Sequence, residues 1–472
     1  MRWVVNAAYL VAGLLYLPVA LYHALVVGKN RRGWAQRLGF VPTFDPTRRR
    51  IWIHAVSLGE VNATPKLVEA LQQRLPDYEF TLSTTTDTGF ARAVALYGRE
   101  RVFRFPLDFS FVVSRVLRRV KPSMIVLVEL EVWYNLVRTA TRRGIPVAVV
   151  NGRLTARSAR RLKLLGGPVR RMFSDLAWVG AQDETIASRF VRLGVRADRV
   201  EVTSSLKWDS ATIADEVEGA QTLRRALGID PSRSLWVCGS TGPGEEEMIL
   251  EAYRRILQEC HPRAPEAVNA ATEGIDQRPP LLAIVPRKPE RFDEVASKIQ
   301  RAGFTCLRRS DHADGTARED ERACISESPP TPATVILGDS MGELRKFYSL
   351  ADVVFVGRSL VPMGGSDPME VAALSKPMVC GPHMDNFRSA VEALVAADAV
   401  RIVRSPDALA QVIRELLRDH AIASGLGARA RQVVIQNQGA TVRTADKVVQ
   451  LLKTAALSSG PSARSRGLQQ FS

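Results

Sequence analysis

The sequence has few of the groups that hold disulfides or metal ions. Its five cysteines are absent from the first half of the chain, and no two are spaced as CxxC, which argues for a reducing compartment and against a zinc site. No DxD motif occurs, and no histidine is expected near the acidic pair that follows the strand at 124–128. The basic residues lack interleaved aromatics and match no DNA-binding motif, so we expect no nucleic-acid partner.

The length of 472 residues and the formal charge of +16 suggest two large domains with unequal charge. Residues 1–209 hold 33 Lys and Arg against 16 Asp and Glu, a net of +17, which leaves 32 against 33 for the remainder. The first half therefore carries the whole excess, which fits contact with an anionic membrane surface.

An almost uncharged apolar stretch runs from Trp3 to Val27, interrupted only by Asn6, Pro18 and His23. It is long enough to span a bilayer, and the basic residues from Lys29 onward predict a cytoplasmic location for the rest of the chain. We therefore expect residues 1–28 to form a single anchor helix in the inner membrane, with the rest of the protein at the cytoplasmic face. A helix lying in the membrane interface is the alternative, and the single Arg2 in front disfavours a cleaved signal peptide.

Short apolar segments alternate with amphipathic helical stretches, which predicts an α/β protein with two doubly wound parallel sheets. We expect one domain over residues 29–209, a linker over 210–232, a second domain over 233–440, a C-terminal helix over 441–457 and a disordered tail over 458–472. Residues 261–280 and 309–333 are predicted to be surface insertions. The predicted strands are 51–56, 80–83, 124–128, 146–150, 177–180 and 200–203 in the first domain, and 235–238, 281–285, 334–337, 353–356 and 377–380 in the second.

Three glutamates follow predicted strands of the first domain. Glu60 comes after the strand at 51–56, and Glu129 with Glu131 comes after the strand at 124–128. A carboxylate at this edge of a sheet can take a proton from a sugar hydroxyl. Ser57 and Glu60 equally fit a capping box, and the glutamate pair fits a structural role bound by Arg153. Metal binding by this pair is a third option.

Three loops of the second domain have the pattern of ligand-binding turns. The Gly-rich loop at 239–246 follows a strand and opens a helix, where backbone N–H groups and the helix dipole can hold a phosphate. The loops at 339–343 and 363–370 place Ser340 three positions before Glu343 and Asp367 three before Glu370. Helix capping is one interpretation of both glutamates. In the other, Glu370 holds a ribose diol while the loops pack on a base and a phosphate.

Three cations complete the set of candidates. Arg287 directly follows a strand and can pair with a phosphate or a sugar carboxylate, whereas Arg291 is expected to be an exposed helix residue. Lys207 is predicted beside the interdomain hinge, where it can reach the cleft, although a surface role is the usual one for a lone lysine.

The order and spacing of these motifs over residues 1 to about 455 resemble the 3-deoxy-D-manno-octulosonic acid (Kdo) transferases, family 30 of the glycosyltransferases. The matching motifs are Trp34…Arg37-Leu38-Gly39, Ser57-x-Gly59-Glu60, the loop Thr84–Gly89, Glu129-x-Glu131-x-Trp133-x-Asn135, Asn151-x-Arg153-Leu154-x-x-Arg157-Ser158, Leu206-Lys207-x-Asp209, Gly239-Ser240-Thr241…Gly244-Glu245-Glu246, Met341-Gly342-Glu343-Leu344, Gly364-Gly365, Pro368-x-Glu370 and Gly381-Pro382-His383…Asn386-Phe387.

The resemblance implies a GT-B fold, with two Rossmann-like domains facing a cleft and an N-terminal anchor helix. The N-terminal domain would bind a lipid A precursor, lipid IVA, and the C-terminal domain the donor CMP-Kdo. Glu60 would be the general base, while Glu129 or Glu131 and Lys207 would stabilise the transition state. Transfer would invert the anomeric configuration and use no metal and no cofactor, because helix N-termini and cations can stabilise departing CMP. The residues implied to bind the donor are Ser240, Thr241, Pro286, Arg287, Met341, Gly342, Glu343, Gly365, Asp367 and Glu370.

The chain departs from the family pattern mostly in the donor half. Gly242 and Lys288 stand where the family has histidines, Arg358 and Ser204-Ser205 where it has Gly and Gly-Asn, and Ser366-Asp367 where it has His-Asn. A carboxylate at Asp367 would repel a CMP phosphate unless Lys288 or Arg358 offsets it. The alternatives are a related membrane glycosyltransferase with another nucleotide sugar, and a degenerate homologue that only binds lipid or a partner. Retention of the candidate catalytic residues speaks against the last.

Overall fold

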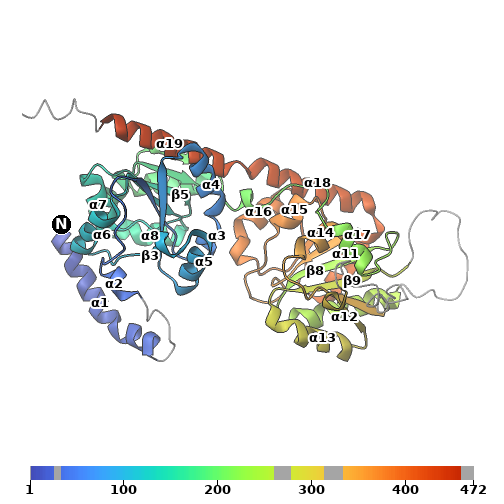
Figure 1. Cartoon of the computed structure of the whole chain (residues 1–472). Coiled ribbons are helices and arrows are strands. Elements are labelled where there is room, and N and C mark those ends of the chain that lie inside the picture. Colours follow the sequence, from blue (N-terminus) through green and yellow to red (C-terminus); the bar gives the residue numbers. More distant parts are fainter. Residues whose placement is uncertain (1, 26–32, 260–277, 313–332, 459–472) are drawn as a thin grey trace, which may run out of the picture. The chain divides into compact units, whose positions relative to one another are not determined.

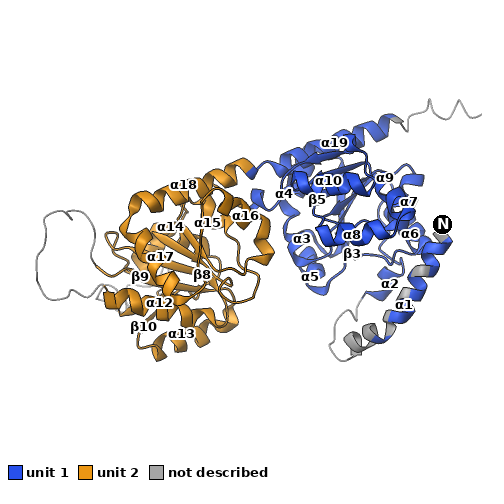
Figure 2. Cartoon of the chain, turned by 180° about the vertical axis from the view of Figure 1, so that it is seen from behind, with its two compact units in different colours: residues 1–210, 437–472 blue, residues 211–436 orange. Residues whose placement is uncertain are grey.

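The computed structural model of the chain describes residues 2–25, 33–259, 278–312 and 333–458. These residues form two compact units, one of residues 1–210 and 437–472 and one of residues 211–436 (Figures 1 and 2). Residues 210–232 were expected as a linker; all of them except Ser210 fall in the second unit, and they contain α11 (Ala220–Ala226). The expected C-terminal helix is α19 (Ala440–Ser458), in the first unit. Most of both predicted insertions, and the tail beyond Ser458, lie outside the described residues.

The first unit is a seven-stranded parallel sheet in the order β3-β2-β1-β4-β5-β6-β7. Its strands are β1 (Arg49–His54), β2 (Tyr78–Thr84), β3 (Val102–Arg104), β4 (Met124–Val128), β5 (Val147–Gly152), β6 (Trp178–Ala181) and β7 (Val200–Val202). The strand order reverses between β1 and β4, which pair directly, Ile53 opposite Val126 and His54 opposite Leu127. Ligands of such sheets bind beyond the carboxyl ends of the strands at this point of reversal.

Helices cover both faces of this sheet because successive strand residues point to opposite sides. Ile51 and Ile53 pack in one core with α4 and α19, whereas Trp52 packs in the other core with α6, α7, α9 and α10. The helices of the unit are α1 (Arg2–Leu25), α2 (Trp34–Arg37), α3 (Leu58–Asn62), α4 (Pro65–Arg74), α5 (Asp87–Tyr97), α6 (Ser110–Val120), α7 (Tyr134–Arg142), α8 (Ala156–Leu164), α9 (Gly167–Ser174), α10 (Glu184–Leu193) and α19.

The second unit repeats the architecture, with a parallel sheet in the order β10-β11-β9-β8-β12-β13-β14. Its strands are β8 (Leu235–Thr241), β9 (Leu281–Pro286), β10 (Thr305–Arg308), β11 (Thr334–Leu337), β12 (Val353–Val356), β13 (Met378–Cys380) and β14 (Arg401–Ile402). The helices are α11, α12 (Glu245–Glu259), α13 (Phe292–Arg301), α14 (Leu344–Leu350), α15 (Met369–Ala373), α16 (Arg388–Ala396), α17 (Pro406–Arg418) and α18 (His420–Asn437). The order reverses between β8 and β12.

The expectation of two doubly wound α/β domains is confirmed, and each predicted strand coincides with an observed one apart from small shifts at its ends. Three strands were missed, β3, β10 and β14, and all three lie at an edge of a sheet. They are short and only partly apolar, so they lack the continuous hydrophobic run that identifies a buried parallel strand.

Helix α1 is bound to the first unit by polar contacts near its start. The Asn6 side chain donates to the Ser110 hydroxyl (2.8 Å) and accepts from the Ser110 N–H (3.1 Å) and the Asn135 side-chain amide (3.0 Å). The Tyr9 ring packs edge-on against Phe109, with centroids 6.2 Å apart. None of the helices within the described ranges is both long enough and apolar enough to cross a bilayer.

Candidate active site

The carboxylates of Glu60, Glu129 and Glu131 lie close together where the strand order of the first unit reverses. Glu60 lies in α3, directly after β1, and Glu129 immediately follows the neighbouring strand β4. Glu129 has a φ of 61°, a left-handed conformation that costs a non-glycine residue about 1–3 kcal/mol. Its carboxylate takes no hydrogen bond or ion pair from another described residue. Strain of this kind concentrates at functional sites.

Hydrogen bonds to the preceding turn fix the Glu60 carboxylate. The Ser57 hydroxyl caps α3 and donates to Glu60 Oε1 (2.8 Å), while the Val56 N–H donates to Glu60 Oε2 (2.9 Å). The capping interpretation of residues 57–60 therefore holds, with the carboxylate reaching one residue beyond the usual N-cap N–H. The cap orients Glu60 and leaves its remaining lone pairs available at the sheet edge.

The threonine-rich loop after β2 clamps this turn. The Val56 carbonyl accepts from the hydroxyls of Thr84 (2.9 Å) and Thr86 (3.1 Å) and from the N–H of Thr85 (3.3 Å). Arg37, which is buried, donates to the Thr85 carbonyl (2.7 Å). Two motifs that are distant in the sequence thus hold the backbone under Glu60.

The environment of Glu60 raises the pKa of its carboxyl to about 7. Burial is the main cause, the nearby charges of Glu129 and Glu131 add to it, and the hydrogen bonds from Val56 and Ser57 oppose it. Burial also raises the pKa of Glu131. A carboxylate whose pKa lies near neutrality is well matched to accept a proton.

A histidine lies beside these carboxylates, contrary to the expectation that none would. His54 ends β1 and is fully buried; its ring stacks on Phe105, and its Nε2 lies 4.0 Å from Glu131 Oε2. Its Nδ1 bonds the Ser83 carbonyl (3.0 Å), and burial lowers its pKa to about 3, so the ring is neutral. The spacing of residues in the sequence did not indicate this contact, which arises because β1 and β4 are neighbours in the sheet. No ion pair joins Arg153 to Glu129 or Glu131 in the described structure.

Lys207 lies at the same edge of the sheet. The Asn151 side-chain oxygen, at the end of β5, accepts from the Leu206 N–H (3.1 Å) and the Ser205 hydroxyl (3.2 Å), which fixes the segment that carries Lys207. The next acidic residue of the motif has a structural role, since Asp209 accepts from the Gly439 N–H (2.7 Å) ahead of α19.

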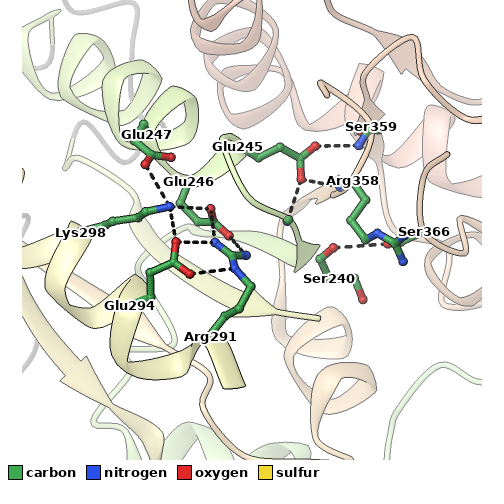
Figure 3. A network of polar contacts seen from close by, with 11 residues as sticks. Ser240, Glu245, Glu246, Glu247, Arg291, Glu294, Lys298, Arg358, Ser359 and Ser366 are labelled. Atoms are coloured by element: carbon green, nitrogen blue, oxygen red, sulfur yellow. Dashed lines mark hydrogen bonds and ion pairs between the residues drawn. The ribbon is translucent and has the colours of Figure 1, made fainter. Parts of the chain in front are cut away.

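In the second unit, the Gly-rich loop is closed by its own carboxylate. Glu245, fully buried at the start of α12, accepts from the N–H groups of Gly242 (3.0 Å), Ser359 (2.6 Å) and Leu360 (2.9 Å), and from that of Arg358 (Figure 3). These donors of the β8–β12 crevice are therefore internally satisfied. A phosphate bound here would have to use other groups of the loop.

Arg291 is buried, so its predicted exposure is wrong. Its guanidinium makes two hydrogen bonds to the fully buried Glu246 carboxylate (2.7 and 3.0 Å), and Glu294 and Lys298 complete the network in Figure 3. Sequence alone could not reveal this because the partner is 45 residues away. The network joins α12 to the turn before α13.

Several of the residues that are expected to bind the donor substrate lie around Tyr348. Ser240, the residue before the last of β8, lies next to the buried Tyr348 hydroxyl, whose pKa is raised by burial and by the charges of Glu370 and Asp367. Burial raises the pKa of Glu370, and the nearby charges of Arg345 and Arg287 oppose this shift. A Cβ on Gly239 would lie 2.2 Å from the Tyr348 oxygen, so only glycine fits there. The structure therefore brings Ser240, Arg287, Asp367 and Glu370 into one neighbourhood.

The remaining residues that are expected to bind the donor differ in their surroundings and exposure. Thr241 and Pro286 are neighbours in the β8–β9 ladder, and Gly365 packs where a Cβ would meet Met384. The Asp367 side chain accepts from the Met369 N–H (2.8 Å), although Pro368, and not Asp367 as expected, stands at the N-cap position of α15. Met341 is 70% exposed, and Gly342 has a φ of 84°.

Glu343 is held by cations and by Ser340, but Ser340 does not cap a helix as expected, because α14 begins at Leu344 and Glu343 itself stands at its N-cap position. Ser340 donates to its carboxylate, Arg309 donates to both of its oxygens (2.9 and 3.2 Å), and Lys346 lies 3.2 Å away. Arg309 is itself buried, so the predicted surface insertion at 309–333 begins with a core residue, drawn inward by this ion pair.

Four departures from the family pattern lie in described parts of the structure. Arg358 and Ser204 replace expected glycines yet keep left-handed φ angles of 59° and 67°. A Cβ on Gly242 would lie 2.7 Å from Met363 Sδ and 3.1 Å from Arg358 Cγ, so these two side chains occupy the space of a larger residue. Lys288 is exposed and paired with Glu290.

Comparisons with known proteins agree with one another. A family model described as 3-deoxy-D-manno-octulosonic-acid transferase matches residues 32–210. The 3-deoxy-D-manno-octulosonic acid transferase of Haemophilus influenzae is 34% identical over 89% of this chain and 91% of its own length. The Bordetella pertussis protein of the same name is 34% identical over 85% of this chain and 87% of its own length.

Among solved structures, UDP-GlcNAc 2-epimerase from Neisseria meningitidis, bound to UDP-GlcNAc, superposes with a TM-score of 0.51 at 13% identity. The match covers 86% of this chain and 100% of that protein. It shows a shared two-domain fold.

Proposed function

This chain belongs to the 3-deoxy-D-manno-octulosonic acid (Kdo) transferases, and on that premise we propose that Glu60 is the base of its reaction and that residues around Tyr348 hold the donor. The protein is a glycosyltransferase of the GT-B fold that transfers Kdo in lipopolysaccharide biosynthesis. The observation that carries the site proposal is the Glu60 carboxylate with its pKa of about 7, beside the carboxylates of the strained Glu129 and of Glu131.

In the proposed reaction the donor is CMP-Kdo and the acceptor is the lipid A precursor lipid IVA. Glu60 takes the proton of an acceptor hydroxyl, whose oxygen forms a bond to the anomeric carbon of Kdo. The bond from that carbon to the phosphate oxygen breaks, and CMP leaves with the electron pair. A single displacement of this kind inverts the anomeric configuration. Glu129 or Glu131 and Lys207 stabilise the positive and negative charge that develops.

The proposed donor site uses no metal and no cofactor. Arg287 pairs with the CMP phosphate or the Kdo carboxylate, and Glu370 holds the ribose diol. The charge of Asp367 works against the phosphate. Its side chain is drawn toward the start of α15 by the Met369 N–H, which supports a position where repulsion is reduced. Ser240, Thr241, Pro286, Met341, Gly342, Glu343 and Gly365 line or shape the same loops.

The acceptor is a lipid, so we also propose contact with the cytoplasmic face of the inner membrane. Helix α1 supports this because Trp3, Leu14 and Leu15 are 60–77% exposed, an unusual density for a soluble surface. The net charge of +17 on residues 1–209 suits an anionic lipid surface.

The test is release of CMP when the purified protein is incubated with CMP-Kdo and the tetraacyl disaccharide bisphosphate. The proposal expects release that depends on the acceptor and a lipid product heavier by one or more Kdo units. In a thermal-shift panel, CMP should stabilise the protein more than UDP or GDP. Stabilisation by UDP or GDP in preference to CMP would instead favour a different nucleotide-sugar donor.

A further inference from the structure

A groove between α8 and α10 in the first unit is lined by cations that face one another. It has a volume of about 400 Å³ and is lined by Ala156, Ala159, Arg160, Lys163, Arg189, Arg192 and Leu193. Arg160 and Lys163 are three residues apart on α8, and Arg189 and Arg192 are three apart on α10, so each pair shares one face of its helix. No acidic side chain of the described residues lines the groove.

The positive charge is unbalanced on the α8 side of the groove, whereas α10 begins with Asp183 and Glu184. Between Glu131 and Asp175 the chain has ten Lys and Arg and no Asp or Glu. Arg189 and Arg192 are oriented by backbone carbonyls, with Arg189 donating to Leu154 (2.7 Å) and Arg192 to Ser188 (3.2 Å), rather than by carboxylates. Four like charges around one hollow repel one another, and a bound anion would remove this repulsion.

The walls of the groove are apolar, which distinguishes its ligand from a free ion. Alanines and Leu193 lie between the cations, and α8 buries none of its residues completely. Leu164 and Leu165, next to Lys163, are 86% and 63% exposed. A small inorganic anion would use neither the volume nor the apolar surface, whereas a lipid headgroup with its attached glycerol or sugar would use both.

We propose that the α8–α10 groove binds the phosphomonoester of a lipid headgroup, held between Arg160 and Lys163 on one helix and Arg189 and Arg192 on the other. A phosphomonoester carries close to two negative charges and three acceptor oxygens, and arginine binds such a group bidentately. The proposal rests on the proposed function only in taking an anionic lipid as partner. It gives that partner a defined site.

The test compares binding of the full-length protein to phosphatidylcholine vesicles that contain phosphatidic acid, a phosphomonoester, or phosphatidylglycerol, a phosphodiester, at matched surface charge. Because α1 is expected to contribute equally to binding of both vesicles, its contribution cancels in the ratio of the two affinities. We expect wild type to prefer phosphatidic acid by at least about tenfold, and the double variant Arg160→Gln/Lys163→Gln to lose this preference. Arg189→Gln/Arg192→Gln, on the facing helix, should do the same.

The matched control is Arg161→Gln/Arg171→Gln, which removes the same charge from exposed positions outside the groove. It should weaken binding to both vesicles alike and keep the ratio. An equal loss of the ratio in control and groove variants would overturn the proposal, as would a wild type that does not prefer phosphatidic acid. CMP release reports on transfer separately, so failure of the groove and failure of the proposed reaction can be told apart.

Discussion

Replacing Glu60 by glutamine should make the folded protein more stable at alkaline pH while it removes the proposed base. The folded pKa of about 7 lies above the ordinary value of 4.5, and at 1.36 kcal/mol for each tenfold change in acidity this difference sets an upper limit of roughly 3–4 kcal/mol. Because the side chain is partly exposed, we expect roughly 1–2 kcal/mol after solvent screening. The single side-chain oxygen of glutamine can accept from the Val56 N–H, and its amide can donate to the Ser57 hydroxyl, so that bond reverses and the cap of α3 survives.

The sign follows from proton binding. The folded state holds the Glu60 proton more tightly than the unfolded state, so its contribution to stability is complete below pH 4.5 and is lost as pH rises through 7. Urea unfolding across this range should show the Gln variant gaining on wild type as pH rises. Glu69→Gln, an exposed change of the same charge on α4, serves as control. A Glu60→Gln variant whose stability relative to wild type does not change with pH would refute the raised pKa.

Three further changes test what holds each unit together. Glu246→Ala leaves the buried Arg291 without its bidentate partner and should cost the second unit about 3–5 kcal/mol in urea unfolding; a loss below about 1 kcal/mol would contradict the network. Asp209→Ala removes the acceptor of the Gly439 N–H and should destabilise the first unit by about 1 kcal/mol, which faster hydrogen exchange at the start of α19 would reveal. Ser204→Gly relieves a left-handed residue and should stabilise the same unit by about 0.5–1 kcal/mol in thermal unfolding, whereas destabilisation would show that the side chain matters more than its φ.

The central strands of both sheets were predictable because each is buried on both faces and therefore reads as an uninterrupted apolar run. β4 and β12 were predicted with their observed ends, Met124–Val128 and Val353–Val356. Edge strands such as β14 (Arg401–Ile402) have one neighbouring strand and need no apolar run. Their hydrophobic pattern was therefore too short to predict a strand. Helix α1 shows a second limit, since hydropathy predicted a span but could not reveal that Asn6 bonds Ser110.

The candidate site was predictable where it depends on chain order and unpredictable where it depends on distant partners. Glu60 and Glu129 follow strands that pair, so the reversal of strand order brings them together. His54 was overlooked because its approach to Glu131 follows from strand pairing and not from spacing. Arg291 was predicted to be exposed because nothing near it in the sequence indicated the buried carboxylate on α12, 45 residues away.

The most direct test of the account is the rate of acceptor-dependent CMP release from CMP-Kdo, measured against pH for wild type and for Glu60→Gln. We expect the wild-type rate to rise with pH with a midpoint near 7, as Glu60 loses its proton. We also expect the Gln variant to be slower by about a hundredfold or more and to have lost that step. A Gln variant with the wild-type rate and pH profile would contradict the role of Glu60 as base.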